Sequence, residues 1–253
     1  MLDREKFLRP IAHRGLHDAA KGLIENTAPA FEAAIKAGYG IECDLQPAAD
    51  GTPLVFHDLE LDRLTAGTGL ITELQPACAA KLPFKDTKLT GILTFAELLT
   101  LVAGRVPIFA EIKSEWAPPD LGFLSEIARA GKLYRRPLAL MSFDPAVVAA
   151  IKRLAPELPR GIVSGSYFDD DGKGWWPDSA LTDARRQALA SLLESGQADP
   201  SFYAYEVGAL PTAATQRARR QGIPLLTWTV RTEQDRRIAA QHADAPIFEG
   251  FTP

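Results

Sequence analysis

Short apolar runs alternate with longer amphipathic segments along the whole chain. Apolar runs bounded by glycine or proline are typical of buried strands, and apolar residues at i, i+3 and i+4 are typical of helices that cover a core. The strand-like runs are 10–13, 40–45, 54–57, 107–112, 137–142, 161–164, 202–205, 224–230 and 246–248. The helical patterns are 27–37, 94–103, 120–130, 145–154, 182–194, 211–221 and 232–241. This alternation favours a parallel sheet with helices packed outside it.

The number of strand-like runs points to one architecture. Nine is one more than an eight-stranded barrel needs, but segment 47–53 holds an Asp50-Gly51 turn signal and is too short for a crossover helix. Antiparallel strands need only a tight turn, so 54–57 is expected to return as a hairpin. We therefore predict an α/β fold, a single (β/α)8 TIM barrel domain over 1–253, with a small hairpin insertion after strand 2 at about 46–90. A doubly wound sheet is the alternative, but no glycine-rich dinucleotide or Walker loop follows the first run.

Local signals place the ends of several predicted helices. Thr27 and Asp144 are suited to N-caps, and Gly131 to a C-terminus. The sequence stops at Pro253 soon after the last strand-like run, so no eighth outer helix is expected at the C-terminus. We expect the gap to be covered either by residues 2–8 or by a partner subunit in a homo-oligomer.

Composition and charge narrow the function classes. With 28 Lys and Arg against 32 Asp and Glu, the formal net charge is −4, which argues against a nucleic-acid partner. The charged N-terminus does not resemble a signal peptide, and no apolar run approaches the ~18 residues of a membrane span. We expect a cytoplasmic protein without stable membrane insertion. Cys43 and Cys78 are not in a Cys-x-x-Cys pair, so neither a disulfide framework nor a zinc cluster is expected.

Carboxylates gather at the ends of the predicted strands. Glu42 and Asp44 are two residues apart, so both project from one face of a strand. Their mutual repulsion calls for a proton or a cation, and oxygen ligands suit Mg²⁺ or Ca²⁺, with Mn²⁺ also acceptable. Glu111 and Lys113 repeat the spacing on the next strand and would add a third metal ligand and a cation for a bound anion. The alternative is a solvated polar strand edge with an ordinary ion pair.

Two of the four histidines fall at the functional ends of strands. His13 closes the first strand and His57 ends the return hairpin. Two imidazoles beside a metal-bound anion could break a phosphodiester, since one can take a proton from the nucleophile and the other can protonate the leaving alkoxide. Arg14 adds a planar fork for phosphate oxygens. His17 and His242 are expected to be ordinary core or surface residues.

A series of ordered motifs resembles the glycerophosphodiester phosphodiesterase family. The resemblance runs from about His13 to Trp228 and extends toward the end of the chain. Its elements are His13-Arg14-Gly15, Ile24-Glu25-Asn26-Thr27, Phe31-Glu32-Ala33-Ala34, Glu42-Cys43-Asp44, Phe56-His57-Asp58 with Leu61 and Arg63, Gly67-x-Gly69, Leu93-Thr94-Phe95, Glu111-Ile112-Lys113, Ser142-Phe143-Asp144 and Trp228-Thr229-Val230.

The resemblance implies a TIM-type barrel that hydrolyses small glycerophosphodiesters to sn-glycerol 3-phosphate and an alcohol. It implies His13 and His57 as acid and base, and a divalent cation on Glu42, Asp44 and Glu111. It also implies five substrate-binding residues: Arg14 and Lys113 at the phosphate, Trp228 near the glycerol or leaving group, and Glu25 and Asn26 in a first loop near the metal and phosphate.

The sequence leaves several alternatives open. One is a lysophospholipase D or a phospholipase C-like enzyme that acts on a larger lipid, and another is a barrel that binds a phosphodiester without turnover. Which histidine acts as the base stays open, as does the choice between water and a substrate hydroxyl as the nucleophile.

Two departures from the family pattern occur near the last two strands. Arg231 follows Trp-Thr-Val, and Glu249 stands in a strand end that often reads Thr-Asp-x-Pro. We expect neither to touch the metal or the histidines. Arg231 either favours an anionic headgroup or forms an ion pair with Glu249. The tryptophan-rich loop 166–180 could pack over the core, and we favour a mobile flap that excludes water from the site.

Overall fold

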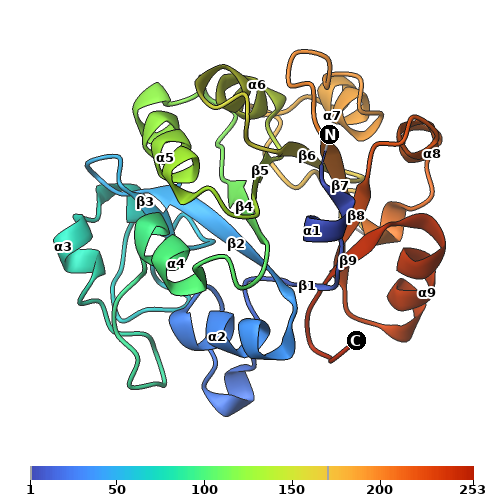
Figure 1. Ribbon diagram of the computed structural model, residues 1–253. Helices are drawn as coiled ribbons and strands as arrows, with labels where there is room; N and C mark the ends of the chain where they lie inside the picture. The colour runs from blue at the N-terminus through green and yellow to red at the C-terminus, as the bar shows by residue number, and fades with distance from the viewer. Residues whose placement is uncertain (1, 170) are drawn as a thin grey trace.

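Eight parallel strands form a closed barrel in the computed structural model, which describes residues 2–169 and 171–253. β1 pairs with both β2 and β9, and this pairing closes the sheet. The predicted (β/α)8 barrel is therefore confirmed (Figure 1). The parallel strands are β1 (Ile11–Ala12), β2 (Gly40–Pro47), β4 (Ile108–Ile112), β5 (Leu138–Ser142), β6 (Arg160–Ser164), β7 (Phe202–Glu206), β8 (Leu225–Val230) and β9 (Ala245–Phe248).

The ninth strand is the expected hairpin. β3 (Pro53–Val55) runs antiparallel to β2, with Leu45 opposite Val55. The turn uses Gly51 at φ 84°, a conformation that glycine adopts without steric cost. The chain then packs a small apolar cluster of its own before it returns to the barrel, with Phe56, Leu61, Ile71 and Phe84 among its buried members.

Helices surround the barrel, and their ends show which capping signals operate. They are α2 (Ala28–Ala37), α3 (Pro76–Ala79), α4 (Phe95–Val102), α5 (Leu121–Tyr134), α6 (Pro145–Leu154), α7 (Asp183–Ala190), α8 (Ala213–Arg220) and α9 (Glu233–His242). Asp144 caps α6 by accepting a hydrogen bond from the Ala146 amide at 2.9 Å, as predicted. Thr27 holds the N-cap position of α2, but its hydroxyl donates to the carbonyl of Ile24 instead.

Gly131 does not end its helix, and that prediction was wrong. α5 continues through it to Tyr134. A Cβ at this position would lie 2.6 Å from Leu158 Cδ1 and 3.2 Å from Leu138 Cδ2. The glycine therefore permits close packing of the helix on its neighbours rather than a left-handed turn.

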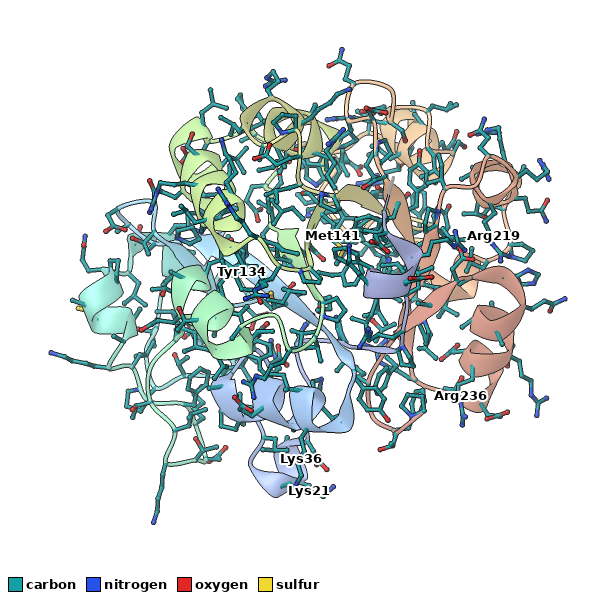
Figure 2. The ribbon with its side chains drawn as sticks, viewed as in Figure 1. Lys21, Lys36, Tyr134, Met141, Arg219 and Arg236 are labelled. Atoms are coloured by element: carbon teal, nitrogen blue, oxygen red, sulfur yellow. The ribbon has the colours of Figure 1, made fainter. Side chains whose placement is uncertain are left out.

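The barrel lumen is filled with apolar side chains and is closed at one end by the start of the chain. Phe109 contacts Phe7 and Phe202 edge-to-face, at centroid distances of 5.6 and 5.5 Å. Phe7 lies on α1 (Arg4–Phe7), which sits near the middle of the ring in Figure 1, and Met141 lies in the middle of Figure 2. Residues 2–8 thus plug the lumen and do not cover the outer gap, contrary to one of the two expectations.

The outer face of β9 is covered by aromatic side chains. After β9 the described chain has no helix, and Phe251 packs on Phe248 at 5.3 Å between ring centroids. Tyr39 contacts the same Phe248 ring edge-to-face at 5.1 Å. Within the described residues, no helix combines the length and the apolar character needed to cross a membrane.

Candidate active site

The turn after β1 brings a histidine, an arginine and a backbone amide to the carboxyl end of the barrel. Gly15, at φ 80°, packs so closely on α2 that a Cβ would lie 2.9 Å from the Ala30 carbonyl carbon. Arg14 itself is left-handed at φ 53°, and its amide donates to Glu42 Oε2 at 2.9 Å. The turn therefore places His13 Nε2 3.9 Å from the same Glu42 oxygen.

Three buried carboxylates meet between β2 and β4. Asp44 is directly opposite Glu111 in the sheet register, and Glu42 lies one pleat earlier on the same face. One oxygen from each lies within 4.8 Å of the others. Burial, together with the charges of Asp44 and Glu111, holds the pKa of Glu42 well above its usual range. The structure thus brings the three predicted metal ligands together.

Two cations balance this acidic triad. The Lys113 ammonium lies 2.7 Å from Asp44 Oδ1 and 2.6 Å from Glu111 Oε1. Burial would raise the pKa of Asp44, but Lys113, His57 and Arg14 outweigh it and hold that pKa well below its usual range. The position of the Lys113 ammonium shows that the three carboxylates attract a positive charge. Because their donor atoms are all oxygens, they fit a hard cation. Arg14 is the second cation, and its Nε lies 3.4 Å from Asp44 Oδ2.

His57 is held by a carboxylate and an arginine. Its Nδ1 lies 2.7 Å from Asp58 Oδ1, and Asp58 Oδ2 accepts from Arg63 Nε at 2.6 Å. Burial would raise the pKa of Asp58, but the hydrogen bonds from His57 and Arg63 lower it well below its usual range. Arg63 also donates to both oxygens of Glu25, at 2.8 and 3.1 Å, so it ties the hairpin segment to the first loop.

His13 is held in a similar way from the other side of the barrel. Its Nδ1 lies 2.5 Å from Glu249 Oε2, and Glu249 Oε1 accepts from Arg231 Nε at 2.6 Å. The predicted Arg231–Glu249 ion pair is confirmed, but the expectation that neither residue touches a histidine was wrong. The cause is strand pairing, because the His13 amide donates to the Phe248 carbonyl and so lies beside the end of β9.

His17 also approaches this carboxylate. Its Nε2 lies 3.4 Å from Glu249 Oε2, although His17 was expected to be an ordinary residue. Burial would raise the pKa of Glu249, but the bonds to His13 and His17 hold it well below its usual range. Burial is the largest effect on His13 and lowers its pKa, although the bond to Glu249 opposes that shift.

His13, His57 and the acidic triad line one cavity of about 890 Å³ at the carboxyl ends of the strands. One part is polar and holds both imidazoles, the triad, Arg14 and Lys113. The other part is largely apolar and is formed by Met141, Phe143, Val163, Trp175, Trp176, Trp228 and Ile247.

The loop 166–180 supplies two walls of that apolar part. Trp228 contacts Phe143 and Trp175, at centroid distances of 5.4 and 5.8 Å. The buried Arg186 donates to the Trp176 carbonyl at 2.5 Å and to Asp178 at 2.8 Å, which fastens the loop to α7. The aromatic residues therefore pack on the core and also face the cavity. Residue 170 of this loop lies outside the described residues.

Glu25 and Asn26 lie behind the site. Glu25 accepts from Arg14 Nη1 at 2.7 Å, and Asn26 Nδ2 donates to Asp44 Oδ2 at 2.8 Å. Neither is among the residues that line the cavity. The resemblance implies that they bind substrate, which stays a prediction, and in the structure they contact the arginine and the aspartate.

Comparisons with known proteins agree on one family. Residues 13–248 match the model of the glycerophosphoryl diester phosphodiesterase family. The chain belongs to this family. A probable glycerophosphodiester phosphodiesterase 1 from Mycobacterium tuberculosis is 33% identical over 174 residues, which cover 59% of this chain and 61% of that protein. The glycerophosphodiester phosphodiesterase of Caldanaerobacter subterraneus is 27% identical over 234 residues, with 89% and 86% covered.

A solved structure from Silicibacter pomeroyi has the same fold as the present chain. It is 27% identical, with a TM-score of 0.71, and the match covers 96% of this chain and 90% of that one. The match to the Mycobacterium tuberculosis protein spans about three fifths of that relative's length.

Family motifs alone did not identify every polar group at the site. Glu249 carries no motif signal for its contacts with His13 and His17, because it reaches these two histidines only through the closure of β9 on β1. Arg63 belongs to a quoted motif, but its hydrogen bonds to both Asp58 and Glu25 depend on the fold of the hairpin segment. Gln46 lines the cavity and donates to the His57 carbonyl at 3.2 Å, and its position two residues after Asp44 could have indicated this.

Proposed function

We propose that this chain hydrolyses glycerophosphodiesters to sn-glycerol 3-phosphate and an alcohol, with a divalent cation and two histidines as acid and base. One observation carries the proposal: both imidazoles, the acidic triad, Lys113 and Arg14 line a single cavity at the carboxyl ends of the barrel strands. Catalytic groups in this fold are placed at that end. Membership of the family supports the same class of reaction.

Glu42, Asp44 and Glu111 would hold the cation. Their close oxygens and their burial favour Mg²⁺ or Ca²⁺, with Mn²⁺ also suited to oxygen ligands. Such an ion, when bound, would withdraw charge from a phosphate oxygen. Asn26 would keep Asp44 oriented, since its amide donates to the Asp44 oxygen that does not contact Lys113.

Arg14 and Lys113 would bind the phosphate. Both sit at the polar end of the cavity, and fixed cations in a partly buried site stabilise the charge that builds up on phosphate during attack. One imidazole takes the proton of the nucleophile as the oxygen of the nucleophile bonds to phosphorus. The other gives a proton to the departing oxygen as the phosphorus–oxygen bond to the alcohol breaks. No net proton is gained or lost by the pair.

The aromatic part of the cavity would receive the carbon-bearing part of the substrate. Trp228 lines the same cavity as the polar groups and contacts Trp175 of loop 166–180, so it would pack against the glycerol or the leaving group. The size of the cavity and its apolar walls keep a larger lysophospholipid as the second candidate substrate.

Turnover of purified protein tests the proposal. Glycerophosphocholine, glycerophosphoethanolamine and lysophosphatidylcholine are incubated with Mg²⁺, Mn²⁺ or Ca²⁺ and with a chelator, and glycerol 3-phosphate and free alcohol are measured. We expect cation-dependent release from the two small diesters. Release from lysophosphatidylcholine alone would support the larger-lipid alternative. No release from any diester, with binding retained, would support a barrel that binds without turnover.

A further inference from the structure

We infer that Glu249 is a positioning residue for His13, and that Arg231 in turn positions Glu249. This inference rests on the proposed role of His13. It concerns residues at the ends of the last two strands, where the chain departs from the family pattern.

The strongest support is a repeated arrangement. On one side of the cavity, Arg63 donates to Asp58 Oδ2 at 2.6 Å and to Asp58 Oδ1 at 3.0 Å, and His57 Nδ1 lies 2.7 Å from Oδ1. On the other side, Arg231 binds one oxygen of Glu249 while the other binds His13 Nδ1, at 2.6 and 2.5 Å. Each imidazole is thus attached at the same nitrogen to a carboxylate whose second oxygen is held by an arginine.

Backbone pairing fixes Glu249 between its two partners. The His13 amide donates to the Phe248 carbonyl at 2.9 Å, which sets the end of β1 beside the end of β9. The Glu249 amide donates to the Val230 carbonyl at 3.2 Å, which sets Arg231 on its other side. The glutamate is therefore delivered by three adjacent strands of the barrel and not by a mobile loop.

The contact decides which nitrogen of His13 faces the reaction. An ionised carboxylate accepts hydrogen bonds only, so Nδ1 carries the proton that it donates to Glu249. Nε2 is left toward the acidic triad, 3.9 Å from Glu42 Oε2. The carboxylate also stabilises the imidazolium that forms whenever Nε2 takes up a proton, and loss of such a partner lowers turnover more than substrate affinity.

His17 does not provide a substitute for Glu249. Its Nε2 lies on the same carboxylate oxygen as His13 Nδ1, at the longer distance of 3.4 Å. It therefore shares the acceptor and cannot replace the negative charge.

The test compares Glu249→Gln, Glu249→Ala and Arg231→Gln with the wild-type enzyme. Glu233→Gln, which removes an exposed carboxylate on α9, is the matched control. We expect kcat of Glu249→Gln to fall about 10²-fold with KM within about threefold, and kcat of Arg231→Gln to fall about tenfold or less. Formate at high concentration should restore at least tenfold of the loss in Glu249→Ala, because it can supply the missing carboxylate.

A spectroscopic measurement separates this inference from the proposed function. Proton NMR should show a downfield imidazole N–H signal that disappears in His13→Gln and moves upfield in Glu249→Gln. An unmoved signal in Glu249→Gln would overturn the inference, even if the enzyme had a different substrate. So would a kcat of that variant within threefold of wild type. Full turnover by His13→Gln would instead refute the proposed function.

Discussion

The acidic triad predicts how the stability of the protein should respond to a cation. Two unit charges about 4.8 Å apart repel by roughly 3–4 kcal/mol at an effective dielectric constant near 20. The three oxygens lie within that distance of one another. Lys113 and Arg14 offset part of this repulsion, and a proton on Glu42 relieves two of the three pairs. A bound divalent cation should relieve the remainder.

The expected gain can be worked out from binding. A cation at a hundred times its Kd adds about 2.7 kcal/mol to the free energy of unfolding. For a domain of this size about 1 kcal/mol raises Tm by roughly 2–4 °C, so Mg²⁺, Ca²⁺ or Mn²⁺ should raise Tm by about 5–10 °C over the chelated protein. Differential scanning fluorimetry measures this shift.

Glu42→Gln gives the decisive comparison. It removes one ligand and, like the proton on Glu42, leaves this position uncharged, so its chelated form should melt no lower than the chelated wild type, and most of the cation shift should disappear. Glu115→Gln, at a carboxylate that lines the cavity outside the triad, should keep the shift. A wild type with no shift for any of the three cations, or a Glu42→Gln variant with the full shift, would refute a cation site on the acidic triad.

Four further outcomes are expected. His13→Ala and His57→Ala should each lose roughly 10²–10⁴-fold in kcat after full metal loading, and near-normal turnover by both would contradict their assignment. Lys113→Met should lower kcat/KM but increase the Tm gain from the cation, because the ammonium that binds Asp44 and Glu111 no longer competes; a smaller gain would argue against competition. The pKa of Asp58 is lower in the folded state than the ~3.9 of an unfolded chain, so its stabilisation is present above about pH 4 and lost as pH falls through the folded pKa. Urea unfolding of Asp58→Asn should therefore depend less on pH below about 4 than that of wild type, and equal slopes would refute the assignment. Gly131→Ala should cost about 1–3 kcal/mol, because its Cβ would lie 2.6 Å from Leu158 Cδ1; unchanged stability in denaturant would show that Leu158 moves aside freely.

The number of strand-like runs along the chain predicted the barrel, and patterns within one turn or strand predicted its hairpin and the two carboxylates on one face. The Asp50-Gly51 turn set β3 antiparallel, and the two-residue spacing of Glu42 and Asp44 placed both carboxylates on one face. Gly131 was misread because glycine marks a helix end and a close packing contact equally well in sequence. Only the position of Leu158 distinguishes the two.

Contacts between distant strands could not be predicted in the same way. Glu249 meets His13 because β9 closes on β1, and its side chain happens to be long enough to reach both the imidazole and Arg231. Glu25 and Asn26 contact Arg14 and Asp44, which line the cavity, but do not line it themselves. Residue type and spacing suggested the chemistry. The contacts of Glu249 with His13 and Arg231 could be seen only in the closed sheet.

Residues 2–8, which plug the barrel lumen, have a consequence for the folding of the chain during its synthesis. Phe7 contacts Phe109 of β4 and belongs to the same apolar cluster as Phe202 of β7, and Arg4 binds Asp244, 240 residues later in the chain. The lumen can be completed only after β9 has been made, so a nascent chain should expose Phe109 and Phe202 until then. Late closure of this kind is slow and favours association of incomplete chains. Expression yield should therefore depend on chaperones that shield partly synthesised barrels.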